Sequence, residues 1–201
     1  LKNNITYKIL FFVAVFAMGS LISNAQDLDF EAALDHLSKT KPATYTGIDS
    51  ILKPFERDSI KMKRVLETAK LNAYHEGASY ALNALGVINR NISNYDKAIE
   101  LHEQGESFAD KAKNNELRIV NLNMIGVAYR RMDIIKPALD YHTEALKIAY
   151  EVKDPSPTVN YNIAVSQNSI GNIYLALQQY DIAIMQFKKS LEIEEKANNK
   201  L

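Results

Sequence analysis

One apolar sequence motif centred on a glycine occurs three times along this chain of 201 residues. The copies read Ala84-Leu85-Gly86-Val87-Ile88, Met124-Ile125-Gly126-Val127-Ala128 and Ser169-Ile170-Gly171-Asn172-Ile173. Gly86, Gly126 and Gly171 are 40 and 45 residues apart. Self-similarity at such a period is typical of a helical solenoid, in which each unit packs only against its neighbours. We therefore predict an all-α fold, an α-solenoid of antiparallel helix pairs.

Each glycine is predicted to lie in the first helix of a pair, with turns at Asn94, near Asp133 and at Gln179. A glycine within a helix lowers the stability of that helix by about 1 kcal/mol relative to alanine. Its recurrence at three equivalent positions therefore indicates a structural role. The second helices carry an alanine twelve residues after the glycine, at Ala98, Ala138 and Ala183. We expect the paired helix to approach the glycine closely and this alanine to complete the contact.

The organisation predicted from these signals has five parts. They are a signal peptide at 1–25, an N-terminal helical cap or degenerate repeat at 26–72, and repeats at 73–115, 116–157 and 158–201. We expect Asn114-Asn115 and Asn198-Asn199 to end second helices, because asparagine tolerates left-handed backbone. Pro155 and Pro157 are expected to lengthen the second break by five residues. The last repeat reaches Leu201 with no further helix over its apolar face, so we expect the array to continue.

The first 25 residues have the pattern of an export signal. Lys2 and Lys8 precede an apolar run from Ile9, and the small residues Ser23 and Ala25 frame a cleavage site before Gln26. The run is shorter than the ~20 residues that a membrane span needs. We expect an exported protein, periplasmic or secreted, and the alternative is an uncleaved membrane anchor at the same residues.

Composition excludes several classes of function. The chain has 24 basic and 24 acidic residues, so it lacks the positive field that nucleic-acid binding uses. It has no cysteine, which excludes disulfides, a thiolate nucleophile and an acylated cysteine anchor. We expect no nucleic-acid partner.

No catalytic or cofactor motif is present. The segment from His102 to Glu106 begins like a zinc-protease helix, but that motif needs a second histidine where Glu106 stands. His102 and His142 also occupy equivalent repeat positions, which favours a structural role. Glycine-rich phosphate loops and nucleophile elbows are missing. We therefore expect no enzyme, no metal and no cofactor within these residues.

The chain resembles the tetratricopeptide repeat family over residues 73–201. The family pattern is met by Leu122, Ile125, Gly126, Tyr129 and Ala138, and again by Ile170, Gly171, Tyr174, Ala183 and Phe187. Departures are Asn89 in place of tyrosine, and His102 and His142 in place of phenylalanine. The period is closer to that of the long-helix members found in bacterial regulators. The resemblance implies a right-handed superhelix whose first helices line a concave groove.

A repeated polar pattern on the first helices is the candidate binding site. Asparagine stands three residues before each glycine, at Asn83, Asn123 and Asn168. The neighbouring positions of the same helices carry Val87, Arg90, Asn91, Val127, Arg130, Arg131 and Asn172. Asparagine amides can pair with an extended peptide backbone, and arginines can select carboxylates. The alternative is that each asparagine forms a hydrogen bond within its own repeat.

These observations favour a non-catalytic, exported module that binds a peptide or protein segment in a groove. The alternative is the extracytoplasmic sensor region of a larger membrane-bound bacterial signalling protein, with a kinase or transcription regulator as output. The expected partner is in both cases a protein or peptide, and no membrane insertion is expected of the mature fragment unless the signal remains uncleaved.

Overall fold

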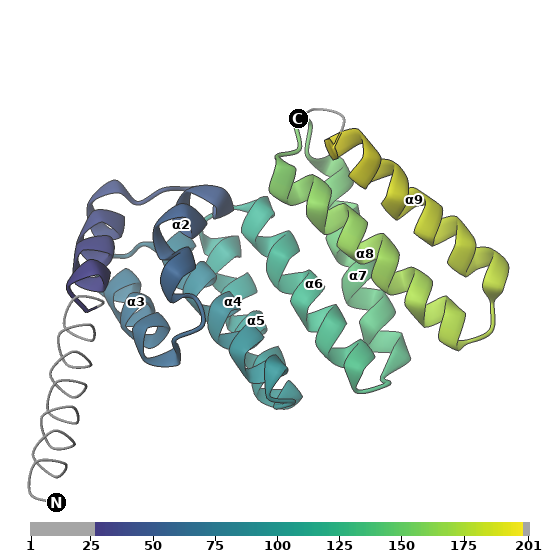
Figure 1. The fold of residues 1–201 in the computed structure, drawn as a ribbon, viewed down its shortest axis with the longest axis horizontal. Coiled ribbons are helices and arrows are strands. Elements are labelled where there is room, and N and C mark those ends of the chain that lie inside the picture. Colours follow the sequence, from purple (N-terminus) through teal and green to yellow (C-terminus); the bar gives the residue numbers. More distant parts are fainter. Residues whose placement is uncertain (1–26, 199–201) are drawn as a thin grey trace, which may run out of the picture.

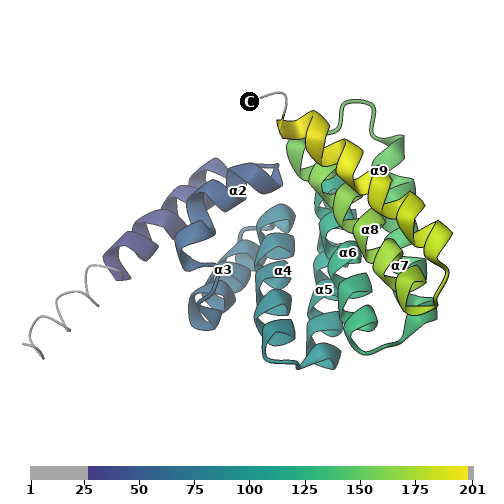
Figure 2. The same ribbon diagram turned by 45° about the vertical axis from the view of Figure 1, so that its right-hand side comes forward.

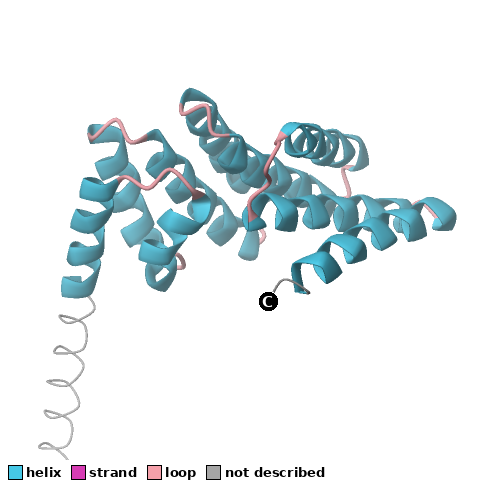
Figure 3. Cartoon of the chain, turned by 90° about the horizontal axis from the view of Figure 1, so that it is seen from above, coloured by secondary structure: helices cyan, strands magenta, loops and turns pink. Residues whose placement is uncertain are grey.

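The computed structural model describes residues 27–198, and this part of the chain is built of helices without a strand (Figures 1 and 3). The helices are one at 27–40, α2 at Tyr45–Leu52, the 3-10 helix η1 at Lys53–Phe55, α3 at Ser59–Leu71, α4 at His75–Asn91, α5 at Tyr95–Lys111, α6 at Asn115–Arg131, α7 at Ile135–Glu151, α8 at Pro157–Ala176 and α9 at Tyr180–Asn198. The predicted all-α solenoid of helix pairs is confirmed.

The helices from α4 onwards form three pairs, α4/α5, α6/α7 and α8/α9, each with extensive contact between its members. The first helices α4, α6 and α8 also contact one another in turn, and the second helices α5 and α7 contact the next first helix. The result is a stack in which consecutive pairs follow one another along the molecule (Figures 1 and 2).

Five of the connections share one turn geometry. One residue in each has a left-handed backbone, with φ between 49° and 61°: Ala73, Ser93, Lys113, Asp133 and Gln178. In each, the next amide donates to the carbonyl five residues earlier at 2.8–3.0 Å, as in Tyr74 to Ala69. This is the Schellman arrangement that satisfies carbonyls at a helix C-terminus. The same turn reverses the chain at each of these five junctions, which keeps the helices that they join in register.

The expectation that Asn114-Asn115 ends α5 is wrong. The left-handed position is taken by Lys113, and Asn114 instead begins the next element, because its side-chain oxygen accepts from the Leu117 amide at 3.1 Å as the N-cap of α6. Asn198 is the last residue of α9, and Asn199 lies outside the described residues.

The connection between α7 and α8 differs from the others. It runs over 152–156, and α8 has 20 residues where α4 to α7 have 17 each. Ser156 caps α8 and Pro157 occupies its first position, where a missing N–H is harmless. The extra five residues therefore lengthen α8 by three and the connection by two, whereas the sequence pattern assigned them all to the break.

The N-terminal segment packs onto the repeats. Phe30, Leu37 and Ile48 join one continuous core with residues of α3, α4 and α5. Asp58 caps α3, and its side-chain oxygen accepts from the amides of Ile60 and Lys61. Figure 2 shows α2 above the upper end of α4 and extending towards α8.

Hydrogen bonds tie α2 to all three first helices. The Tyr80 hydroxyl of α4 donates to Asp49 at 2.7 Å, the Tyr45 amide donates to Glu116 of α6 at 2.8 Å, and the Thr46 and Thr158 hydroxyls lie 3.2 Å apart. The cap therefore bridges the pairs as well as covering the first of them.

The close approach predicted at the repeated glycines is present, but an aromatic ring makes it. A Cβ on Gly86 would lie 2.5 Å from the His102 ring, one on Gly126 2.8 Å from the His142 ring, and one on Gly171 2.6 Å from the ring of Phe187. The alanines at 98, 138 and 183 are buried, yet the atoms nearest each glycine belong to the ring sixteen residues later. The expectation that alanine completes this contact is wrong, because the ring fills the space.

The predicted signal peptide at 1–25 and its cleavage before Gln26 lie outside the described residues. Within residues 27–198, no helix is both long and apolar enough to cross a membrane.

Candidate protein-binding face

Asn83 lies inside the array, where α4, α5 and α6 meet. It is 6% exposed, and its amide nitrogen is 3.4 Å from Nδ1 of His102 and 3.4 Å from the side-chain oxygen of Asn121. Asn121 in turn donates to the Ser79 hydroxyl at 3.1 Å. The side chain therefore links its own repeat to the following first helix.

Asn123 makes the same link one repeat later, with shorter bonds. Its side-chain oxygen accepts from the Ser166 hydroxyl at 2.5 Å and lies 2.9 Å from Nδ1 of His142. Its amide nitrogen donates to the carbonyl of Asn162 at 2.9 Å. Asn123 is completely buried, and every one of these partners is on another helix.

The expectation that all three asparagines line an open face is therefore wrong for Asn83 and Asn123. Both form hydrogen bonds within the array, because a following first helix covers them. Asn168 is exposed and accepts from the Asn172 amide at 2.8 Å, since no described helix follows α8 and α9. The sequence held a signal for this network: Asn121 and Ser166 both stand two residues before the equivalent asparagine.

The two histidines are structural members of this network. The pKa of both His102 and His142 is lowered to about 3, mainly by burial and in addition by the charge of Arg90 for His102 and of Arg130 for His142. A hydrogen bond with Asn121 raises the pKa of His102, but by less than burial lowers it. Both rings are therefore neutral near pH 7. Residues 27–198 hold no group of three His, Cys, Asp or Glu side chains placed to bind a metal.

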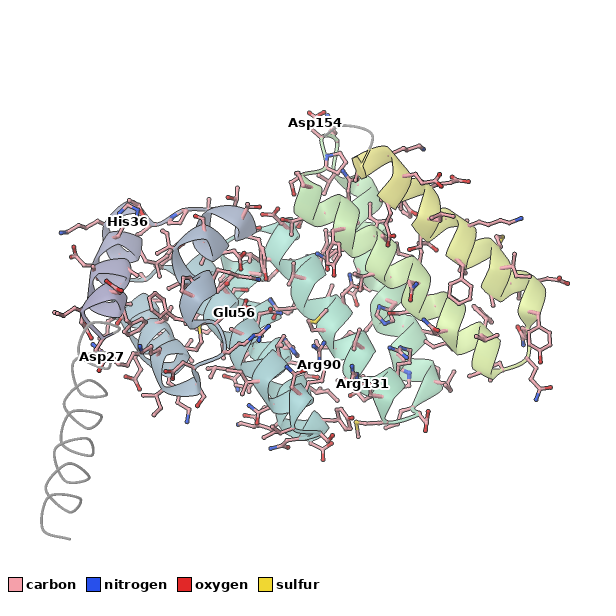
Figure 4. All side chains as sticks on the ribbon, viewed as in Figure 1. Asp27, His36, Glu56, Arg90, Arg131 and Asp154 are labelled. Atoms are coloured by element: carbon pink, nitrogen blue, oxygen red, sulfur yellow. The ribbon has the colours of Figure 1, made fainter. Side chains whose placement is uncertain are left out.

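Three of the remaining predicted site residues are arginines, Arg90, Arg130 and Arg131, and Arg131 lies close enough to the other two for its charge to act on both. We call these three residues the arginine cluster. Figure 4 shows Arg90 and Arg131 near one another, towards the lower ends of α4 and α6. Arg90 crosses from α4 to α6, where its Nη1 lies 3.2 Å from the sulfur of Met124. Val127 is buried, Val87 and Asn172 are half-buried, and Asn91 is exposed.

The arginine cluster has no acidic partner. Among the described residues, no carboxylate lies within ion-pair distance of these three guanidinium groups. Burial and then the charge of Arg131 lower the pKa of both Arg90 and Arg130. Within residues 27–198, the buried Nε atoms of Arg90 and Arg130 have no hydrogen-bond partner. Three like charges held together without compensation favour an anionic ligand.

A shallow depression of about 550 Å³ lies elsewhere, along α7. Its lining includes Arg118, Lys147, Asp140, Glu144 and Glu151, and it contains none of the predicted site residues. Mixed charges at an open surface give it no marked preference for one kind of ligand.

Comparison with known proteins supports the repeat architecture. The tetratricopeptide repeat model matches residues 164–196, which lie within α8 and α9. Repeats of this family generally mediate protein–protein interactions, and such a fold is typically a non-catalytic scaffold. No curated protein matches the chain.

Two solved structures match this chain. BtubC (BKLC) from P. vanneervenii has a TM-score of 0.64 at 15% sequence identity, covering 88% of this chain and 74% of that one. MamA has a TM-score of 0.47 at 18% identity, covering 83% and 91% of the two chains. At 15% identity the similarity to BtubC (BKLC) is one of fold alone.

The buried and exposed asparagines should respond differently to one substitution. Asn123→Ala is expected to lower the free energy of unfolding by roughly 1–3 kcal/mol, because it leaves buried partners unsatisfied. Asn168→Ala should change it by less than about 0.5 kcal/mol. Urea unfolding followed by circular dichroism measures both, and equal effects would contradict the difference in burial.

The histidines should make the fold sensitive to acid. Because their pKa is lower in the folded state than in the unfolded chain, their contribution is present above about pH 6.5 and is lost as the pH falls towards 3. The resulting loss in the free energy of unfolding approaches roughly 1.4 kcal/mol per pH unit for each histidine.

A chain with His102→Phe and His142→Phe should lose less stability between pH 7 and pH 4.5 than the parent. Phenylalanine occupies the equivalent position at Phe187, so the ring itself is tolerated. Unfolding at the two pH values measures the change, and identical pH dependence in both chains would show that the histidines titrate normally.

Proposed function

We propose that this chain is a non-catalytic, exported module that binds an acidic peptide or protein segment across its first helices. Its arginine cluster supplies the binding charge. The single observation that carries the proposal is that three neighbouring guanidinium groups have no carboxylate partner among the described residues. Burying part of an arginine without compensation costs free energy, which a bound carboxylate would recover.

Two features of the surface support binding at this place. Val87, half-buried beside Arg90, provides apolar contact, and exposed Asn91 offers amide hydrogen bonds. The α2 segment already covers the opposite, N-terminal ends of α4, α6 and α8. The proposed ligand therefore occupies the C-terminal ends of α4 and α6. Asn83 and Asn123 contribute indirectly, by fixing the spacing of these helices.

Export is proposed from the pattern of residues 1–25. A sensor role within a larger membrane-bound signalling protein is the second candidate, and the resemblance to long-period repeats of bacterial regulators favours it. Both candidates place the same binding face outside the cytoplasm, so the binding experiment applies to either.

The probe for this function is a fluorescein-labelled extended peptide rich in glutamate, titrated by fluorescence anisotropy. We expect binding that weakens with added salt, because the cluster is partly exposed. The variant with Arg90→Glu and Arg130→Glu should bind at least about a hundredfold more weakly, as expected for losing two charge-assisted contacts of ~1.5 kcal/mol or more each.

The variant with Lys70→Glu and Lys111→Glu is the control matched in charge. Both lysines are exposed at the C-terminal ends of α3 and α5, which adjoin the N-terminal end of α4, whereas Arg90 lies at its C-terminal end. This control should leave affinity within about twofold. Equal weakening by the control would show that net charge alone governs binding, and unchanged binding in the variant with Arg90→Glu and Arg130→Glu would refute the proposed site.

A further inference from the structure

Each turn that joins the first helix of a pair to the second exposes a large aliphatic side chain. Ile92 between α4 and α5 is 71% exposed, Ile134 between α6 and α7 is 38% exposed, and Leu177 between α8 and α9 is 44% exposed. Turns are dominated by small and polar residues, so exposed aliphatic residues at three equivalent junctions are unusual. Figure 1 shows the three turns along the lower edge of the array.

The stacking of helix pairs does not cover the first two of these residues. The pair α6/α7 follows Ile92, and the pair α8/α9 follows Ile134, yet both isoleucines remain exposed. Met132, in the same turn as Ile134, shows the alternative, because it packs against the cluster that contains Ile125 and Ala128. Ile92 and Ile134 therefore lie on the edge of the array and not in the interface between one pair and the next.

The arginine cluster adjoins both isoleucines. Arg90 stands two residues before Ile92, and its side chain crosses from α4 to Met124 of α6. Arg131 is the last residue of α6, three residues before Ile134, and Figure 4 shows it near Arg90. Guanidinium groups thus bridge the two helices whose C-terminal turns carry the exposed isoleucines.

We propose that the segment bound by the arginine cluster is amphipathic, with acidic residues flanked on both sides by large aliphatic residues that pack on Ile92 and Ile134. This inference rests on the proposed function and adds the apolar part of the ligand's chemistry. A purely acidic ligand leaves both isoleucines in water, whereas flanking aliphatic side chains remove apolar surface of both partners from water. Ile92 and Ile134 therefore determine which acidic segments bind most tightly.

A second copy of this chain fits the edge poorly. In a symmetric dimer the same surface patch contacts itself, so the two arginine clusters would lie opposite one another. No carboxylate of residues 27–198 pairs with these guanidinium groups, so nothing in the dimer would offset the repulsion between the like charges. Charge complementarity favours an acidic partner of different sequence.

Two fluorescein-labelled peptides of equal charge test the proposal by fluorescence anisotropy. One has a leucine on each side of a short run of glutamates, and its matched control has serine at both positions. We expect the leucine peptide to bind the whole chain at least about fivefold more tightly, because its two aliphatic side chains leave water on binding.

The variant with Ile92→Ser and Ile134→Ser should lose this preference. It should bind both peptides within about twofold of the affinity that the parent chain has for the serine peptide. The variant with Leu28→Ser and Ile60→Ser is the matched control, since both residues are 71% exposed but lie in the helix at 27–40 and in α3. It should keep the full preference, and thermal unfolding confirms that each variant is folded.

Equal binding of the two peptides to the parent chain would overturn this inference and leave the acidic-segment site standing, whereas binding of neither peptide would refute both. Loss of the preference in the control variant would also overturn it. The same holds if Ile92→Ser with Ile134→Ser abolishes binding to anionic phospholipid vesicles or dissociates a dimer seen in sedimentation, because the isoleucines would then serve a membrane or a second copy.

Discussion

The contact on which the array depends is an aromatic ring seated directly on a glycine of the facing helix. Gly86 receives His102, Gly126 receives His142 and Gly171 receives Phe187, each at a distance that leaves no room for a Cβ. The ring fixes how closely the two helices of a pair approach. Glycine occupies these three positions despite its weak helix propensity, because any side chain would push the two helices of the pair apart.

The histidine rings extend this contact from one pair to the next. His142 packs on Gly126 through one edge and meets Asn123 through Nδ1, and Asn123 in turn binds Ser166 of the following pair. Phe187 has no such polar atom, and its asparagine, Asn168, is exposed. In the earlier repeats, the histidine ring therefore both packs on the glycine of its own pair and bonds to the asparagine that links to the next pair. Phe187 in the last repeat does only the first.

Much of the fold could be predicted from the sequence because the glycine period fixes the helix pairs and their turns. The roles of Asn83 and Asn123 could not, since a polar residue at helical spacing is equally compatible with an open surface and with a buried network. Only the position of the next helix distinguishes them. The left-handed backbone of Lys113 could not be predicted either, because it follows from the turn that the junctions share and lysine has no preference for this conformation.

The central claim is tested most directly by a double-mutant cycle between Gly126 and His142. Gly126→Ala alone should destabilise the fold, because the new Cβ would lie 2.8 Å from the ring, despite a helix-propensity gain of about 1 kcal/mol. In a His142→Ala background the same change should become stabilising, giving a coupling of roughly 1–3 kcal/mol in urea unfolding. If Gly126→Ala stabilises the parent chain and the coupling is zero, the ring does not set the helix approach.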